Sequence, residues 1–180
     1  MSDGRALLTA ARELKPDVII LDIAMPLLNG MVAGERLKQM LPEVKLIFLT
    51  VNEDPGFASE AMRIGASGYL LKSSAASELF HAIEVALEGR TYVTPMIMQD
   101  MVTSLANGRQ PSAASAKLTT RQREVLQLLA EGHSMKKVAT ILDLSPRTVA
   151  FHKYRIMEAL GLKTNADLVQ FAIKHGIISL

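Results

Sequence analysis

The chain contains 180 residues with a formal net charge of +2, and 49% of the residues are hydrophobic. This length is enough for one full domain or two small ones, and the apolar content supports packed cores and excludes an intrinsically disordered chain. There is no cysteine, which excludes a disulfide framework or a thiolate metal site and fits a cytoplasmic protein. The first residues do not resemble a signal peptide, and the longest apolar run is too short to span a membrane.

The charge is unevenly distributed along the chain. Residues 118–180 contain nine lysines and arginines against five acidic residues, whereas residues 1–117 carry a small negative excess. The C-terminal part is therefore the candidate for a polyanionic partner such as a nucleic acid, and no membrane partner is indicated.

Residues 1–89 alternate amphipathic helical patterns with short, continuous apolar runs. We expect strands over residues 18–21, 45–49 and 68–71, between helices over residues 3–15, 31–41, from the loop at 52–56 to residue 65, and 74–87. In the last helix, Leu79, Phe80, Ile83 and Leu87 are expected to face inward. This alternation is typical of a doubly wound parallel sheet, whose strands are buried on both faces.

Three polar residues follow directly on the three predicted strands: Asp22, Thr50 and Lys72. Because ligands bind off the carboxyl ends of parallel strands, we expect these side chains to gather at one edge of the sheet. A carboxylate, a hydroxyl and an ammonium could there attack, orient and neutralise a phosphoryl group. Three ordinary polar residues at strand ends remain the alternative.

Residues 90–116 change character and predict a connection between two domains. Residues 92–105 form a methionine-rich helical pattern, and residues 107–116 have the small, polar composition of a flexible tether. We therefore place one domain at residues 1–89, a linker at 90–116 and a second domain at 117–180.

The second domain is predicted to consist of four helices. Each begins at a capping residue, namely Thr119 with Gln122, Ser134, Ser145, and Thr164 with Asp167. A tight turn at Asp143-Leu144 joins the second and third of these helices, which is typical of a helix-turn-helix. Any small helical bundle is the alternative.

The helix over residues 145–160 has two distinct faces. Val149, Ile156 and Leu160 recur at helical spacing and predict a buried stripe, while Phe151 and Tyr154 point to the opposite side among basic residues. Such a face suits a surface that is both apolar and anionic, such as thymine methyl groups flanked by phosphates. A surface helix with two half-buried aromatic residues is the alternative.

Two family patterns are present. Residues 118–132, with 145–149, 151–152 and 156–157, resemble the LuxR-type DNA-binding domain, and residues 17–26, 49–50 and 65–72 resemble the receiver domain of two-component response regulators. Together they resemble the NarL/FixJ group of bacterial transcriptional regulators. The implied fold is α/β followed by all-α: a partial flavodoxin-like (CheY-like) receiver linked to a four-helix domain.

The resemblance implies a role for each receiver residue. Asp22 matches the phospho-acceptor for a cognate sensor histidine kinase, Thr50 the switch hydroxyl, and Lys72 the lysine that pairs with phosphoryl oxygens. Tyr69 matches the aromatic residue that turns inward on activation. The carbonyl of Ala24 matches a backbone ligand of Mg²⁺.

The chain also departs from the receiver pattern. The family's first strand, first helix and second strand have no counterpart, and with them the acidic pair that holds Mg²⁺. The metal site formed by Asp22 and Ala24 is therefore incomplete, and we expect Mg²⁺ only if an acidic pair is supplied. Phosphorylation of Asp22 should be impaired, and residues 18–21 should form a bare, apolar sheet edge.

The resemblance to the LuxR-type domain divides its surface residues into two groups. Phosphate contacts are expected from Lys136, Lys137, Arg147, Thr148, Lys153 and Lys163. Base contacts are expected from Ala150, Phe151 and Tyr154, whereas His152, near the core stripe, is expected to be packed or to touch a phosphate. Members of the family bind double-stranded DNA as homodimers, and the fourth helix forms the contact between the two subunits. In intact members the receiver covers the recognition helix until the receiver is phosphorylated.

Three function classes follow from these patterns. The first is a sequence-specific transcriptional regulator, which is not an enzyme. The second is an interaction module whose partial receiver titrates a kinase or another regulator. The third is a phosphotransfer enzyme centred on Asp22, which the incomplete metal site argues against. The basic four-helix domain favours the first class, because a titrating module would not need it.

Overall fold

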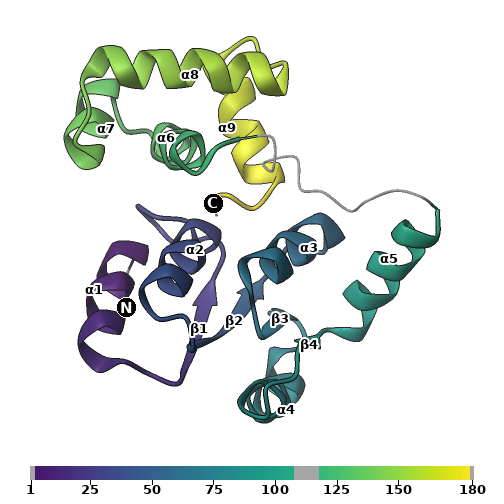
Figure 1. The fold of residues 1–180 in the computed structure, drawn as a ribbon. Coiled ribbons are helices and arrows are strands. Elements are labelled where there is room, and N and C mark those ends of the chain that lie inside the picture. The colour runs from purple at the N-terminus through teal and green to yellow at the C-terminus, as the bar shows by residue number, and fades with distance from the viewer. Residues whose placement is uncertain (1–2, 108–117, 179–180) are drawn as a thin grey trace.

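The computed structural model describes residues 3–107 and 118–178, which form an α/β part followed by a helical part (Figure 1). The α/β part contains α1 (Gly4–Leu14), β1 (Val18–Asp22), α2 (Gly30–Met40), β2 (Lys45–Thr50), α3 (Pro55–Ile64), β3 (Gly68–Leu71), α4 (Ala75–Leu87), β4 (Tyr92–Val93) and α5 (Pro95–Ala106). The helical part contains α6 (Thr120–Ala130), α7 (Met135–Leu142), α8 (Pro146–Leu160) and α9 (Asn165–Lys174).

The four strands form one parallel sheet in the order β1-β2-β3-β4. Helices α1, α2, α3 and α5 pack on one face around side chains that include Phe48 and Tyr69. Helix α4 packs on the other face, where Ala82 and Ala86 contact Ile47 and Leu70. The predicted doubly wound parallel sheet is confirmed.

Strand β1 lies at the edge of the sheet, as predicted. In the described ranges, no strand pairs with its outer side. Ile20, in its centre, is 40% exposed because α4 packs over β2 and β3 and leaves β1 partly uncovered. An unpaired strand with an exposed apolar side chain is a site for unwanted strand pairing.

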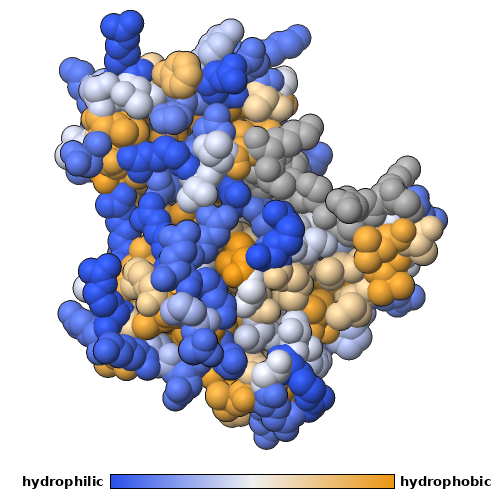
Figure 2. All heavy atoms as spheres, viewed as in Figure 1, coloured by the Kyte–Doolittle hydropathy of each residue, from blue (hydrophilic) through white to orange (hydrophobic). Residues whose placement is uncertain are grey.

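The predicted linker contains a strand and a helix, β4 and α5, that pack on the receiver. Strand β4 pairs with Gly68 and Tyr69 of β3, and α5 packs beside α3 with Ile97 completely buried in the receiver core. Figure 2 shows an apolar patch over the far end of α5, where Val102 and Leu105 are exposed. Because α5 is apolar on several sides, its sequence pattern does not reveal which side is buried. Most of the predicted tether lies outside the described residues.

Helix α4 faces the sheet with only part of the predicted side: Leu79 and Ile83 pack half-buried against the core, as predicted, whereas Phe80 and Leu87 do not. Phe80 is 80% exposed and Leu87 is 55% exposed, whereas Ala82, Val85 and Ala86 are buried. Small alanine side chains let the helix approach the sheet closely, and this close approach decides the orientation. The helical spacing of the larger apolar residues was therefore right for Leu79 and Ile83 and wrong for Phe80 and Leu87.

The four predicted helix starts of the helical part are confirmed. Thr119 and Thr164 each form a capping box with the residue three positions later, and Ser134 and Ser145 accept hydrogen bonds from first-turn N–H groups. The turn between α7 and α8 contains Asp143 in the left-handed conformation, with φ of 54°. The four helices enclose a separate core that includes Val125, Leu126 and Val149.

Membrane-spanning segments were sought in the parts of the chain that the structure describes. None of the helices found there is both long enough and apolar enough to cross a bilayer.

Candidate functional site

Helix α8 has the two faces that its sequence predicts. Pro146 occupies its first turn and the hydroxyl of Ser145 accepts a hydrogen bond from the N–H of Thr148 at 3.0 Å, which defines the helix start. Val149 and Ile156 are completely buried on the inner side. A stable helix is thereby held against the core of its domain by one stripe, which leaves the other side free.

The outer side of α8 presents aromatic rings to solvent. Phe151 is 60% exposed and Tyr154 is 66% exposed, and Arg147 and Ala150 are exposed beside them. The ring of Phe151 meets that of His152 edge-on, with 5.9 Å between the centroids, and His152 itself is half-buried. Two large exposed rings on one helix face are costly in water and are typical of a surface that contacts a ligand or partner.

The predicted phosphate-contacting residues occupy different positions around this face. Lys136, Lys137 and Lys163 are exposed, at the start of α7 and just before α9. Thr148 is half-buried, and its hydroxyl lies 2.8 Å from that of Ser145. Lys153 is also half-buried, and it lines a pocket beside α7 and α9 rather than the outer side of α8.

The receiver does not cover α8. Helix α8 lies on the side of the helical part away from the sheet, and α6 faces the receiver (Figure 1). The exposure of Phe151 and Tyr154 agrees with this arrangement. The expectation that the receiver covers the recognition helix is therefore wrong for this conformation.

The predicted gathering of polar side chains at the sheet edge is seen for two of the three residues. The ammonium of Lys72 donates to Oδ2 of Asp22 in an ion pair, and Oδ1 of Asp22 accepts from the N–H of Ala24 at 3.1 Å. Thr50 lies on the neighbouring strand, 3% exposed, and its hydroxyl accepts from the N–H of Asn52 at 3.0 Å. Lys72 and Asp22 are thus in contact, whereas the hydroxyl of Thr50 is hydrogen-bonded to the loop that follows its own strand.

Tyr69 points into the receiver. Its ring is completely buried, and its hydroxyl donates a hydrogen bond to the carbonyl of Asn52 at 3.2 Å. Burial raises the pKa of Tyr69 well above its ordinary value, so the hydroxyl stays protonated at neutral pH. Tyr69 and Thr50 therefore contact the same loop, at Asn52.

The residues around Asp22 do not fit a magnesium site. A hard divalent cation takes several oxygen ligands, usually including more than one carboxylate or phosphate. Here both oxygens of the single carboxylate already accept hydrogen bonds, one of them from the cationic Lys72. Residues 3–107 and 118–178 contain no cluster of three or more acidic, histidine or cysteine side chains suited to a metal.

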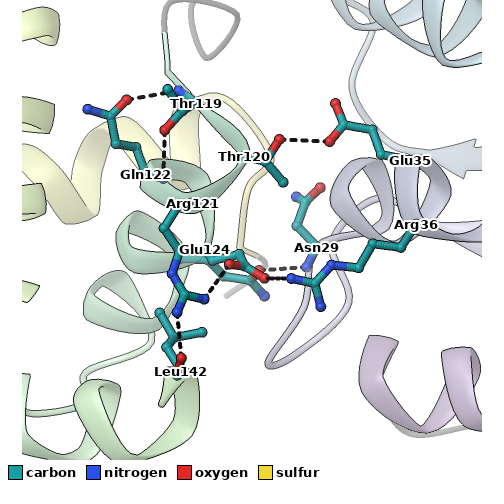
Figure 3. Close-up of polar contacts among 10 residues, drawn as sticks. Asn29, Glu35, Arg36, Thr119, Thr120, Arg121, Gln122, Glu124 and Leu142 are labelled. Carbon is teal, nitrogen blue, oxygen red and sulfur yellow. Dashed lines mark hydrogen bonds and ion pairs between the residues drawn. The ribbon is translucent and has the colours of Figure 1, made fainter. Parts of the chain in front are cut away.

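A polar interface, which no sequence pattern predicted, lies between the two parts of the chain. It joins α2 and the loop before it to α6, and its members include Asn29, Arg36, Thr120, Glu124 and Gln127 (Figure 3). Gln127 is 1% exposed and Glu124 is 2% exposed. No sequence signal marks them, because a glutamine and a glutamate on an amphipathic helix predict a solvated face.

Each part of the chain matches a protein family. The response regulator receiver domain matches residues 1–84, and the bacterial regulatory proteins of the luxR family match residues 116–172. The chain belongs to the response regulators of the NarL/FixJ family, which join a receiver to a LuxR-type DNA-binding domain.

Several relatives cover nearly the whole chain. The response regulator GacA of Pseudomonas aeruginosa is 32% identical over 175 residues, which are 97% of this chain and 82% of that protein. The oxygen regulatory protein NreC of Staphylococcus aureus is 33% identical over 183 residues, covering 98% of this chain and 84% of that protein.

Solved structures of response regulators share the fold. RcsB of Salmonella typhimurium aligns with a TM-score of 0.54 and 25% identity over 94% of this chain and 81% of its own. A LuxR-family response regulator from Aurantimonas aligns with a TM-score of 0.56 and 32% identity over 58% of this chain and 74% of its own.

Proposed function

We propose that this response regulator controls transcription by binding double-stranded DNA sequence-specifically through α8, as a homodimer in the cytoplasm. The observation that carries the proposal is the exposed pair Phe151 and Tyr154 on a helix whose opposite stripe is fully buried. A module that only titrates a partner through its receiver does not account for this face. The structural relative RcsB, 25% identical with a TM-score of 0.52, was solved as a complex with DNA.

The surface residues divide into positioning and reading groups. Lysines near the start of α7 and before α9 contact phosphates and hold the domain on the duplex, without reading its sequence. Phe151, Tyr154 and Ala150 face the base edges in the major groove, where apolar groups contact thymine methyls. Ala150 offers no hydrogen bond, so apolar contacts and groove shape carry much of the specificity.

Dimerisation on DNA is supported by the exposed side of α9. The solvent side of α9 carries Ala166 and Gln170, both exposed, and is free to meet a second copy. Two helix-turn-helix units related by a two-fold axis bind half-sites about one helical turn apart. The target site is therefore expected to be an inverted repeat.

The receiver binds a cognate sensor histidine kinase, but phosphoryl transfer to Asp22 is impaired. The pairing of Asp22 with Lys72 supports its position at the reactive edge. The impairment is supported by the absence, among residues 3–107 and 118–178, of any cluster of three or more side chains that could hold a metal ion. Magnesium assists only if an acidic pair is supplied from outside the described residues.

The proposal is tested by two substitutions on the DNA-facing surface. Lys137→Ala should weaken binding to specific and random duplexes alike, and it should reduce the slope of log affinity against log salt by about one, since one fewer counterion is released. Tyr154→Ala should weaken binding to the selected site by about 1–3 kcal/mol and leave random DNA nearly unaffected. Fluorescence anisotropy at two salt concentrations measures both.

The two variants serve as controls for each other, because both residues are exposed and neither lies in a core. If Tyr154→Ala weakened both duplexes equally while Lys137→Ala spared random DNA, α8 would not lie in the major groove as proposed. If the wild-type chain bound no duplex, DNA binding itself would be refuted.

A further inference from the structure

The loop that follows β1 is held by the helical part of the chain. Gln127 of α6 donates through Nε2 to the carbonyl of Met25 at 2.7 Å, and its Oε1 accepts from the N–H of Asn29 at 2.6 Å. Gln127 is 1% exposed and Asn29 is 6% exposed. One buried side chain therefore satisfies two backbone groups of residues 25–29, which we call the docking loop.

Leu27, at the tip of the docking loop, reaches into the other domain. Its φ is 61°, in the left-handed region that residues with a side chain rarely adopt. Its side chain is half-buried against the core of the helical part, and its N–H donates to Oε1 of Glu131 at 3.1 Å. A strained backbone persists only where its surroundings hold it. Here the N–H of Leu28 donates to the carbonyl of Pro26 at 2.7 Å within the loop, and the contacts of Leu27 with the DNA-binding domain add to this support.

Charged residues cross the same interface. Arg36 of the receiver pairs with Glu124 of α6, which is 2% exposed and also pairs with Arg121 of its own helix at 2.9 Å (Figure 3). Glu124 therefore keeps a partner within its own domain when Arg36 is removed.

A second ion pair has the opposite polarity, with the cation on α6 and the anion on the receiver. Arg123 of α6 lies 2.6 Å from buried Glu60 and 3.7 Å from Glu35 of the receiver, and the hydroxyl of Thr120 donates to Glu35 at 2.9 Å. Each domain thus supplies both a cation and an anion. Such reciprocal pairing specifies one orientation of the two domains.

This contact leaves the recognition surface uncovered. The interface uses α6, whereas α8 lies on the side of the helical part away from the receiver (Figure 1). Phe151 and Tyr154 of α8 are exposed. Figure 2 shows mostly hydrophilic residues over the junction of the two parts on the viewed face. An interface of this composition positions one domain on the other without using the DNA-facing side.

We propose that the docking loop and α6 form an interdomain docking site that orients the DNA-binding domain with its recognition helix free, so that the docked chain binds DNA. The loop begins beside Asp22, whose Oδ1 is bonded to the N–H of Ala24. The docking loop, residues 25–29, therefore connects the end of β1, where Asp22 lies, with α6 of the DNA-binding domain. Only the DNA-binding part of this inference rests on the proposed function.

The docking is measured as a distance in the full chain. Because the chain lacks cysteine, Ala76→Cys on α4 and Ala159→Cys on α8, both exposed, accept spin labels specifically. The double variant Leu27→Gly with Gln127→Ala removes the apolar tip and both hydrogen bonds between Gln127 and the docking loop. The matched control, Leu14→Ala with Gln99→Ala, changes the same residue types at exposed positions away from the interface.

Double electron–electron resonance, with labelled chain diluted into unlabelled chain, should give one narrow distance distribution for the wild type and the control. The double variant should give a broad one. Arg36→Ala is a milder second variant, which leaves Glu124 paired with Arg121 and should also broaden the distribution. A narrow distribution in both variants would refute docking through these residues.

Binding of a random-sequence duplex provides the second arm. Opening a contact that leaves α8 free should not change the affinity. A contact that hides α8 would lower the apparent affinity by the competent fraction, so the opened variants would then bind about tenfold more tightly or better. Tighter binding of that size would overturn the proposal. If no chain bound DNA, the wild type included, the proposed function would fail while the distance measurement still decided the docking.

Discussion

At the scale of single residues, Asp22 lies at the reactive edge of the sheet, and both of its carboxylate oxygens already have hydrogen-bond partners. One carboxylate oxygen is paired with Lys72 and the other accepts an N–H, so neither is free without a rearrangement. Attack on a phosphoryl group by an anionic carboxylate needs cations to neutralise the developing charge. Lys72 supplies one positive charge, and the part of the chain that the structure describes holds no cluster of three or more acidic, histidine or cysteine side chains that could bind a metal cation.

This arrangement predicts weak chemical phosphorylation. Incubation with acetyl phosphate and magnesium should modify the chain far less than it modifies a receiver with a complete acidic pair, measured by intact mass under identical conditions. Asp22→Asn should scarcely change DNA affinity, since α8 is already exposed. Stoichiometric phosphorylation of the wild type would show that the acidic pair is not needed.

At the scale of elements, α4 and α5 show how packing selects one helix face among several. Helix α5 buries Ile97 completely against the receiver, whereas α4 leaves Phe80 80% exposed and packs through alanines. Phe80, although its side chain is larger than that of Ile97, therefore contributes less to the core. Its size would have suggested the reverse.

Two alanine substitutions test whether Ile97 of α5 belongs to the receiver core and Phe80 of α4 to the surface. Ile97→Ala should lower the free energy of unfolding by about 2–5 kcal/mol, because it leaves a cavity in the receiver core. Phe80→Ala should change it by no more than about 0.5 kcal/mol, as expected of a surface position. Urea denaturation followed by circular dichroism gives both values. Equal effects would mean that α5 is not part of the receiver core.

At the scale of the whole molecule, the interface buries an ion pair between Glu60 and Arg123. Burial raises the pKa of Glu60 above its ordinary value of 4.5, although Arg123 and Arg63 act in the opposite direction. The folded chain then holds this proton to a higher pH than the unfolded chain does. The resulting stability is present below pH 4.5 and is lost as the pH rises through the folded pKa.

Glu60→Gln removes this titration and isolates its effect. As the pH rises from 4.5, the wild type should lose stability relative to the Gln variant, until Glu60 is ionised in both states. Urea denaturation of both chains across this range measures the difference, in which the other titrating groups cancel. A relative gain by the wild type with rising pH would show that Arg123 outweighs burial.

The sequence alone determined the features that depend on neighbouring residues. Ser145 and Pro146 define the start of α8, and the spacing of Val149 and Ile156 defines its inner stripe; all of these were predicted and are found. The parallel sheet followed from the alternation of short apolar runs with helical patterns, whereas its bare edge followed from the resemblance to the receiver family. Capping and periodicity act within a few residues, so they can be read from the chain directly.

Only the tertiary structure decided what distant segments do to each other. It buried Gln127 against Asn29, 98 positions earlier, it turned Phe80 outward, and it left α8 uncovered by the receiver. A glutamine on a helix is solvated unless another segment supplies matching backbone donors and acceptors. An apolar residue faces inward only if a complementary surface lies opposite. Both conditions depend on contacts between segments far apart in the sequence, which local patterns do not specify.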